Sequence, residues 1–164
     1  MKILVFTEGT VLMHKNAKGL IREKIVEQSL NREKSVKKYF SYISIGNCVD
    51  KLKTWKLKGA KIFYLTSRKK INEIKYINNI LKKFNFPNGK LLFRKDGETY
   101  SEVAERIIPD VLIEDDCESI GGVNEMTITN VKPLVKKKIK SIVVKEFEGI
   151  DSLPGNLRLL KTLK

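Results

Sequence analysis

The chain has 164 residues, of which 41% are hydrophobic and 32% charged, and this composition indicates one folded domain and excludes a disordered chain. The net charge of +14 is compatible with binding of nucleic acid or of a small anionic ligand, although its lysines fall at spacings typical of solvated helix faces. The two cysteines lack CxxC spacing, which argues against a zinc site, and no apolar run is long enough to cross a bilayer. We therefore expect a single cytoplasmic domain over residues 1–164, with no membrane contact.

The hydrophobic pattern predicts strands that alternate with helices. In chain order it predicts a strand over 3–6, a charged helix over 16–38, a β-prone return over 41–45, a helix over 47–58 and a strand over 60–65. It continues with a helix over 71–84, a strand over 91–93, a helix over 100–107, a strand over 111–113, a lysine-rich helical segment after residue 130, a strand over 142–144 and a helix from about residue 151. This alternation predicts an α/β fold built on a doubly wound parallel sheet with right-handed crossovers.

Polar residues cluster where the predicted strands end. In an open parallel sheet, ligands bind outside the carboxyl ends of the strands. The residues at those ends are Thr7-Glu8-Gly9-Thr10, Thr66-Ser67-Arg68, Arg94-Lys95 and Glu114-Asp115-Asp116. Carboxylate oxygens suit Mg²⁺, while hydroxyls, backbone N–H groups and nearby cations suit a phosphate group. The sequence therefore predicts a site for a divalent metal and a phosphate.

Three of these segments carry a family resemblance. Residues 5–10, 64–68 and 111–116 resemble motifs one, two and four of the haloacid dehalogenase-like phosphohydrolases, and the resemblance runs from residue 1 to about residue 122. It implies a three-layer Rossmannoid sheet. It also implies a flap or small helical cap inserted over residues 11–45.

The resemblance also implies roles for single residues. Thr66 and Ser67 would bind the transferring phosphoryl group, and the phosphate-binding set would comprise Gly9, Thr10, Thr66, Ser67, Arg68 and Arg94. Mg²⁺ would be held by Glu8, Asp115 and Asp116, with Glu114 as a neighbour. The third motif requires a cation, for which Arg94 and Lys95 are candidates and Arg106 and Lys132 are fallbacks. The catalytic set would be Thr7, Glu8, Thr66 and Lys95.

The first motif departs from the family pattern. The family presents Asp-x-Asp-Gly-Thr, in which the first Asp attacks phosphorus and the second acts as general acid and base. Aligning Gly9-Thr10 puts Glu8 at the second Asp and Phe6 at the first, and a one-residue shift would put Thr7 at the nucleophile position. Neither alignment supplies the nucleophilic carboxylate, because Phe cannot attack and a Thr hydroxyl needs an activating base.

Three hypotheses follow. The leading one is a protein that binds Mg²⁺ and a phosphorylated small molecule or nucleotide, with impaired or altered phosphohydrolase chemistry in which water attacks directly and Glu8 is the base. The alternative is a non-catalytic binding or regulatory module on the same scaffold, a pseudoenzyme, which contacts nucleic acid through its basic surface. A third is a homo-oligomer or partner-binding protein that uses residues 11–45 as its interface.

Overall fold

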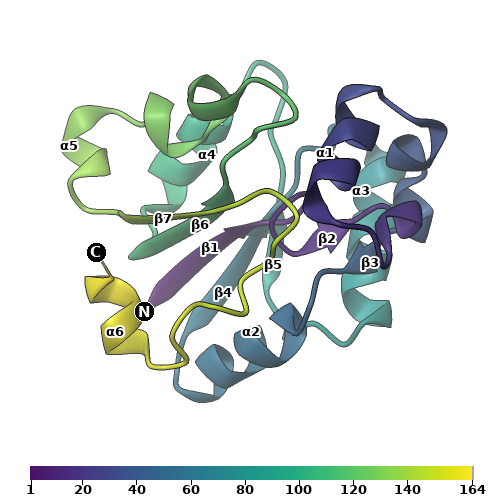
Figure 1. Cartoon of the computed structure of the whole chain (residues 1–164). Helices are drawn as coiled ribbons and strands as arrows, with labels where there is room; N and C mark the ends of the chain where they lie inside the picture. Colours follow the sequence, from purple (N-terminus) through teal and green to yellow (C-terminus); the bar gives the residue numbers. More distant parts are fainter. Residues whose placement is uncertain (164) are drawn as a thin grey trace.

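A parallel sheet forms the centre of the molecule (Figure 1). The computed structural model describes residues 1–163, and in this part of the chain the sheet has five strands in the order β5-β4-β1-β6-β7. These are β1 (Lys2–Phe6), β4 (Lys61–Leu65), β5 (Lys90–Leu92), β6 (Val111–Asp115) and β7 (Lys140–Val144). Each neighbouring pair is parallel, with β1 between β4 and β6. The predicted doubly wound parallel sheet is therefore confirmed.

Helices cover both faces of this sheet and complete three layers. Side chains alternate along a strand, so Ile3 and Val5 of β1 face one core whereas Leu4 faces the other. The first core is covered by α2 (Cys48–Leu57), α3 (Ile71–Lys83) and α6 (Leu157–Thr162). The second is covered by α4 (Tyr100–Ile107) and by the segment that holds the short 3-10 helices η4 (Gly122–Glu125) and η5 (Ile128–Asn130), followed by α5 (Pro133–Lys136).

Residues 11–45 form a small excursion between β1 and α2, where the cap is predicted. It begins and ends with an antiparallel pair, β2 (Leu12–Met13) and β3 (Ile43–Ser44). Between them lie α1 (Arg22–Leu30) and three 3-10 turns, η1 (Lys15–Ala17), η2 (Lys34–Lys37) and η3 (Tyr39–Ser41). The helix predicted over 16–38 is thus reduced to nine residues. Left-handed backbone at Gly19 (φ +78°) and Arg32 (φ +50°) interrupts it on both sides.

Other boundaries also differ from the prediction. The last helix begins at Leu157 and not near Asp151, because Pro154 and Gly155 precede it and the Asn156 side chain caps it by accepting the N–H groups of Arg158 and Leu159. Strand β6 runs two residues past its predicted end, since it pairs with β7 as far as Asp115 and Val144. Among residues 1–163, no helix combines the length and the apolar character that a membrane span requires.

Candidate functional site

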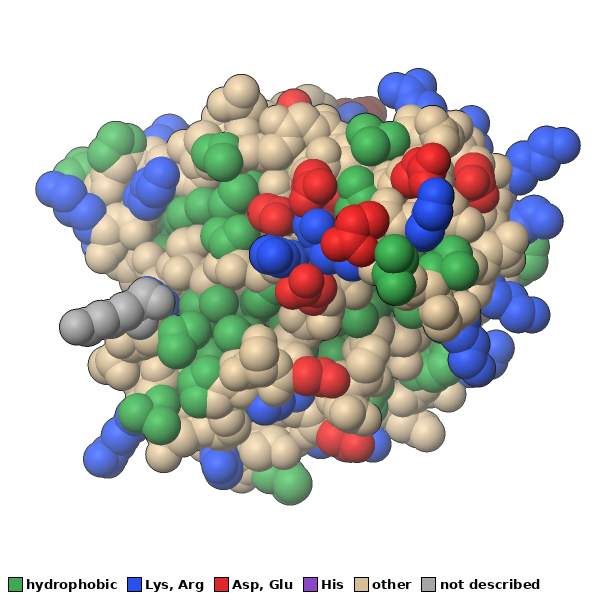
Figure 2. Space-filling view, viewed as in Figure 1, with side chains coloured by type: hydrophobic (Ala, Val, Ile, Leu, Met, Phe, Trp, Pro, Cys, Tyr) green, Lys and Arg blue, Asp and Glu red, His purple; other side chains and the backbone are tan. Residues whose placement is uncertain are grey.

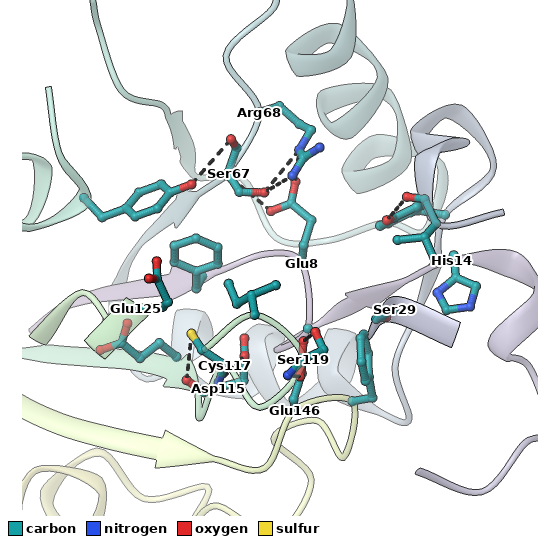
Figure 3. Close-up of a pocket in the computed structure, with 18 of the residues that line it drawn as sticks. Glu8, His14, Ser29, Ser67, Arg68, Asp115, Cys117, Ser119, Glu125 and Glu146 are labelled. Atoms are coloured by element: carbon teal, nitrogen blue, oxygen red, sulfur yellow. Dashed lines mark hydrogen bonds and ion pairs between the residues drawn. The ribbon is translucent and has the colours of Figure 1, made fainter. Parts of the chain in front are cut away.

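A cavity opens at the carboxyl edge of the sheet, where the sequence places its polar strand ends. Its volume is about 310 Å³, and its walls come from the ends of β1, β4, β6 and β7, the loop after β5 and the 11–45 excursion (Figure 3). Carboxylates from three of these strand ends, Glu8, Asp115 and Glu146, border it together. Acidic side chains also gather near the middle of the face drawn in Figure 2, whereas lysines and arginines project mainly from its rim.

The end of β4 provides donors for an oxyanion, and Glu8 occupies them. The Thr66 hydroxyl donates to Glu8 Oε1 (2.5 Å), and the Ser67 N–H donates to Glu8 Oε2 (3.1 Å). The Arg68 Nε lies 3.5 Å from Glu8 Oε1. We call the Thr66 hydroxyl, the Ser67 N–H and the Arg68 guanidinium the oxyanion cradle. These groups are the ones predicted to hold a phosphoryl group, and here they hold a carboxylate of the chain itself.

Neither candidate for the nucleophile position presents a carboxylate. Phe6 borders the cavity, and its ring packs edge-on against Tyr100, with 5.1 Å between ring centroids. Thr7 is completely buried, and its hydroxyl lies 2.7 Å from Glu8 Oε2 and 3.1 Å from the Leu65 carbonyl oxygen. A hydroxyl has one proton, so Thr7 can donate to only one of these two acceptors at a time, and Thr7 does not line the cavity.

The acidic run after β6 is split between two faces. Glu114 borders the cavity, but its carboxylate accepts the N–H groups of Thr127 and Ile128 (2.7 and 2.9 Å) and so fastens the segment that covers the second core. Asp115 points to the opposite side, as strand alternation requires, and accepts the Thr10 hydroxyl (2.9 Å). Glu114 therefore supports the fold beside the site, whereas Asp115 belongs to the site itself.

Three carboxylates could hold a cation. Ligand oxygens of Asp115, Asp116 and Glu146 all lie within 4.8 Å of one another. The Glu146 N–H donates to Asp116 Oδ1 (3.0 Å), and the Glu146 carboxylate accepts the N–H and hydroxyl of Ser119 (2.7 and 2.6 Å). Burial raises the pKa of Asp115 to about 6 and also raises the pKa of Glu146. Hard, closely spaced oxygens in this setting fit Mg²⁺.

Gly9 and Thr10, both predicted to bind phosphate, instead shape the acidic cluster. The Gly9 N–H donates to the Leu12 carbonyl, and a Cβ at Gly9 would lie 2.7 Å from Asp115 Oδ2. Thr10 is completely buried and directs its hydroxyl to Asp115. Thr10 therefore positions Asp115, and the missing side chain of Gly9 leaves room for the Asp115 carboxylate.

Two arginines border the cavity. The Arg68 guanidinium lies 4.2 Å from the centroid of Tyr39 in the excursion, and the Arg94 guanidinium lies 3.9 Å from that of Tyr100. The Arg94 Nε is buried and has no hydrogen-bond partner among the described residues. Arg94 is therefore the third-motif candidate that reaches the cavity.

The other candidate cations lie elsewhere. Lys95 is exposed and is not among the residues that border the cavity. Arg106 pairs with Glu98 (3.0 Å), and Lys132 pairs with Glu105 (3.2 Å). The catalytic role predicted for Lys95 consequently has no contact with the cavity to support it.

Sequence reasoning did not identify Glu146 or Arg22. Glu146 lies two residues after β7, so the rule applied to the other strand ends would have found it. Arg22 comes from α1 in the excursion, and its Nη2 lies 2.5 Å from Glu118 Oε2 and 3.6 Å from Asp116 Oδ2. No local pattern marks Arg22, because its partners are about a hundred residues away. The sole histidine, His14, also borders the cavity, where its Nε2 lies 2.8 Å from Gln28 Oε1.

Comparison with known proteins gives structural likeness only. No protein-family model matches the chain, and no curated protein matches its sequence. Two structures of the class C acid phosphatase from Bacillus anthracis, one with tungstate bound, match 90% of this chain and 68% and 67% of theirs, at 16% identity and TM-scores of 0.54 and 0.55. A chain of the Pnkp1/Rnl/Hen1 complex also matches at 16% identity and a TM-score of 0.55, over 88% of this chain and 46% of that one.

At these identities the likeness shows the fold alone. The comparisons agree with the observed sheet, whose carboxyl edge carries the three motif segments at the ends of β1, β4 and β6. The chain accordingly shares the fold of these structures, a three-layer α/β fold around a parallel sheet.

Proposed function

We propose that the protein binds a divalent cation together with a phosphorylated small molecule or nucleotide in this cavity, and that any hydrolysis proceeds without a phospho-aspartate. One observation carries the proposal: Ser67 and Arg68 of the oxyanion cradle border the same cavity as Asp115 and Glu146 of the three-carboxylate cluster. A phosphate ligand needs both, because donors hold its oxygens and a cation offsets their charge.

The carboxylate cluster fits the cation that the fold implies. Asp115, Asp116 and Glu146 would hold it, since their oxygens lie close together and two of the three are buried. Bringing such charges out of water is costly unless a cation compensates them, as the raised pKa of Asp115 indicates. Bound there, Mg²⁺ would neutralise phosphoryl oxygens. Glu8, which was predicted as a metal ligand, lies in the cradle instead.

The residues of the chain limit the chemistry. The cradle would orient the phosphoryl group, and Arg68 and Arg94 would offset its charge. Because neither Phe6 nor Thr7 supplies a carboxylate where the family has its nucleophile, water is the nucleophile that remains. Glu8 is the nearest carboxylate to the cradle that could take a proton from that water. We therefore expect slow turnover or ligand binding alone.

A screen of phosphorylated metabolites with and without Mg²⁺ tests this proposal. Phosphate release and the shift in unfolding temperature would be measured for the wild type and for Asp116→Asn, which keeps the acceptor for the Glu146 N–H but removes the charge. The control is Glu118→Gln, because Glu118 also pairs with Arg22 but is outside the cluster. We expect a Mg²⁺-dependent response that Asp116→Asn loses and Glu118→Gln keeps. An equal response in all three proteins would refute the metal site.

The charge distribution favours a second candidate, a non-catalytic module that contacts nucleic acid. On the face drawn in Figure 2, lysines and arginines project mainly from the rim, and the chain as a whole carries a net charge of +14. Such lysines would displace counterions from a phosphate backbone. Binding of RNA or DNA that changes little between low and moderate salt would count against this role.

A further inference from the structure

The oxyanion cradle holds an anion in the structure, and that anion is the Glu8 side chain (Figure 3). Both carboxylate oxygens are used: Oε1 accepts the Thr66 hydroxyl, and Oε2 accepts the Ser67 N–H. The Arg68 guanidinium lies beside Oε1 at 3.5 Å, and the Glu8 side chain is only 12% exposed. The Glu8 carboxylate therefore occupies every group of the cradle.

A phosphate group and this carboxylate cannot use the cradle together. Both are oxyanions that accept from the same donors, and two anions at hydrogen-bonding distance from one another repel strongly where water is largely excluded. A ligand must therefore replace Glu8. The cradle donors lose nothing in the exchange, because each of their hydrogen bonds to the carboxylate is replaced by one to a phosphoryl oxygen. The Thr7 hydroxyl, which lies 2.7 Å from Glu8 Oε2, keeps the Leu65 carbonyl oxygen as an acceptor.

The local backbone restricts how Glu8 can leave. The Thr7 N–H donates to the Leu65 carbonyl at 2.8 Å, and the Gly9 N–H donates to the Leu12 carbonyl at 2.9 Å, so the chain is fixed on both sides of Glu8. The side chain, in contrast, has three rotatable bonds and borders the open cavity. Release thus requires a change of side-chain rotamer and no movement of the strand.

We infer that Glu8 is a built-in occupant of the oxyanion cradle, which a phosphate monoester must displace in order to bind. This inference rests on the proposed function and explains how phosphate binding would be regulated. The affinity for phosphate is set by competition with the Glu8 side chain for the same donors. Whatever draws Glu8 away from Thr66 and Ser67 raises that affinity.

The test is calorimetric titration with inorganic phosphate, with and without Mg²⁺. The wild type is compared with Glu8→Ala, which empties the cradle, and with Glu8→Asp, which keeps the charge but shortens the reach by one methylene. Glu125→Gln is the matched control, since Glu125 borders the same cavity but makes no hydrogen bond to the cradle. Circular dichroism and thermal unfolding check that each variant is folded.

Glu8→Ala should bind phosphate about tenfold more tightly than the wild type, because charge-assisted hydrogen bonds no longer have to be exchanged. The phosphate affinity of Glu8→Asp should lie between that of the wild type and that of Glu8→Ala. If Glu8→Ala does not fold, the comparison of Glu8→Asp with the wild type is the test. The control should stay within about twofold of the wild type. Adding Thr66→Val to Glu8→Ala should remove the gain, because the cradle then lacks its hydroxyl donor.

Two patterns overturn the inference alone. In the first, phosphate binds to the wild type and to Glu8→Ala equally well, or less tightly to the variant. In the second, Glu125→Gln tightens binding as much as Glu8→Ala, which would mean that cavity charge and not occupancy is responsible. If neither the wild type nor any variant binds phosphate at any Mg²⁺ concentration, the proposed function itself fails and the inference with it.

Discussion

Replacing Gly9 by alanine should disrupt both the fold and the acidic cluster. Gly9 has φ +81°, a left-handed conformation that costs a residue with a Cβ about 1 to 2 kcal/mol. The new Cβ would also lie 2.7 Å from Asp115 Oδ2. The Asp115 carboxylate is buried and held by the Thr10 hydroxyl at 2.9 Å and the Cys117 N–H at 3.0 Å, so it cannot withdraw without losing hydrogen bonds worth about 1 kcal/mol each. Together these effects predict a loss of about 2 to 4 kcal/mol in the free energy of unfolding.

Gly59→Ala separates the two contributions. Gly59 has φ +88°, but no heavy atom lies within 4 Å of the position that its Cβ would take. Urea unfolding should therefore show a loss of about 1 to 2 kcal/mol for Gly59→Ala and a larger loss for Gly9→Ala. Stabilisation by Mg²⁺ should also be weaker in Gly9→Ala alone. Equal losses in the two variants, or a loss below about 1 kcal/mol for Gly9→Ala, would contradict the close contact between Gly9 and Asp115.

Three further predictions concern charges. Arg94→Ala should weaken phosphate binding about tenfold in calorimetry, because the Arg94 guanidinium borders the cavity. Lys95→Ala should leave the affinity unchanged, since Lys95 is exposed and outside the cavity lining. Weaker binding in Lys95→Ala and unchanged binding in Arg94→Ala would instead assign the cation to Lys95. Arg22→Met should tighten Mg²⁺ binding by a few-fold at most, because the guanidinium 3.6 Å from Asp116 opposes a second cation there, and an unchanged affinity would show that the pair is irrelevant to the metal. The Lys2 N–H donates to the Asp110 carboxylate and lowers its pKa. The charged Asp110 carboxylate therefore adds stability above its unfolded pKa of about 4, and this stability is lost as the pH falls through its lower folded pKa. The difference in unfolding free energy between the wild type and Asp110→Asn should therefore be full at pH 6 and vanish in strong acid, and a difference that does not change with pH would contradict this origin.

The architecture of the sheet could be read from the sequence for a simple reason. Buried parallel strands are continuous apolar runs, and each of the five predicted runs is a strand of the observed sheet. The polar segments that end those runs must then share one edge. The spacing of the three motif segments placed them at the ends of predicted strands. The sequence therefore identified Thr66, Ser67, Arg68 and Asp115 as candidates for the site.

The excursion over residues 11–45 was harder to predict, because its local signals conflict. Its charged residues have good helix propensity, yet left-handed backbone at Gly19 and Arg32 confines α1 to nine residues. Of the apolar residues in and beside α1, Ile25 and Val26 are buried, whereas Leu20, Ile21 and Leu30 are exposed. Tertiary contacts of the 3-10 turns, such as Phe40 against Tyr76 of α3, decide the path of this segment.

The sequence by itself determined the order of strands and helices along the chain, the edge at which the site lies and the absence of a nucleophilic carboxylate at Phe6 and Thr7. Only the tertiary structure decided which side chains meet there. It turned Glu114 away from Asp115, brought Glu146 and Arg22 to the acidic cluster, and placed the Glu8 carboxylate on Thr66 and Ser67. Local sequence constrains backbone conformation and burial, whereas the direction of a side chain and its partners depend on strands and loops that are distant in the chain and adjacent only after folding.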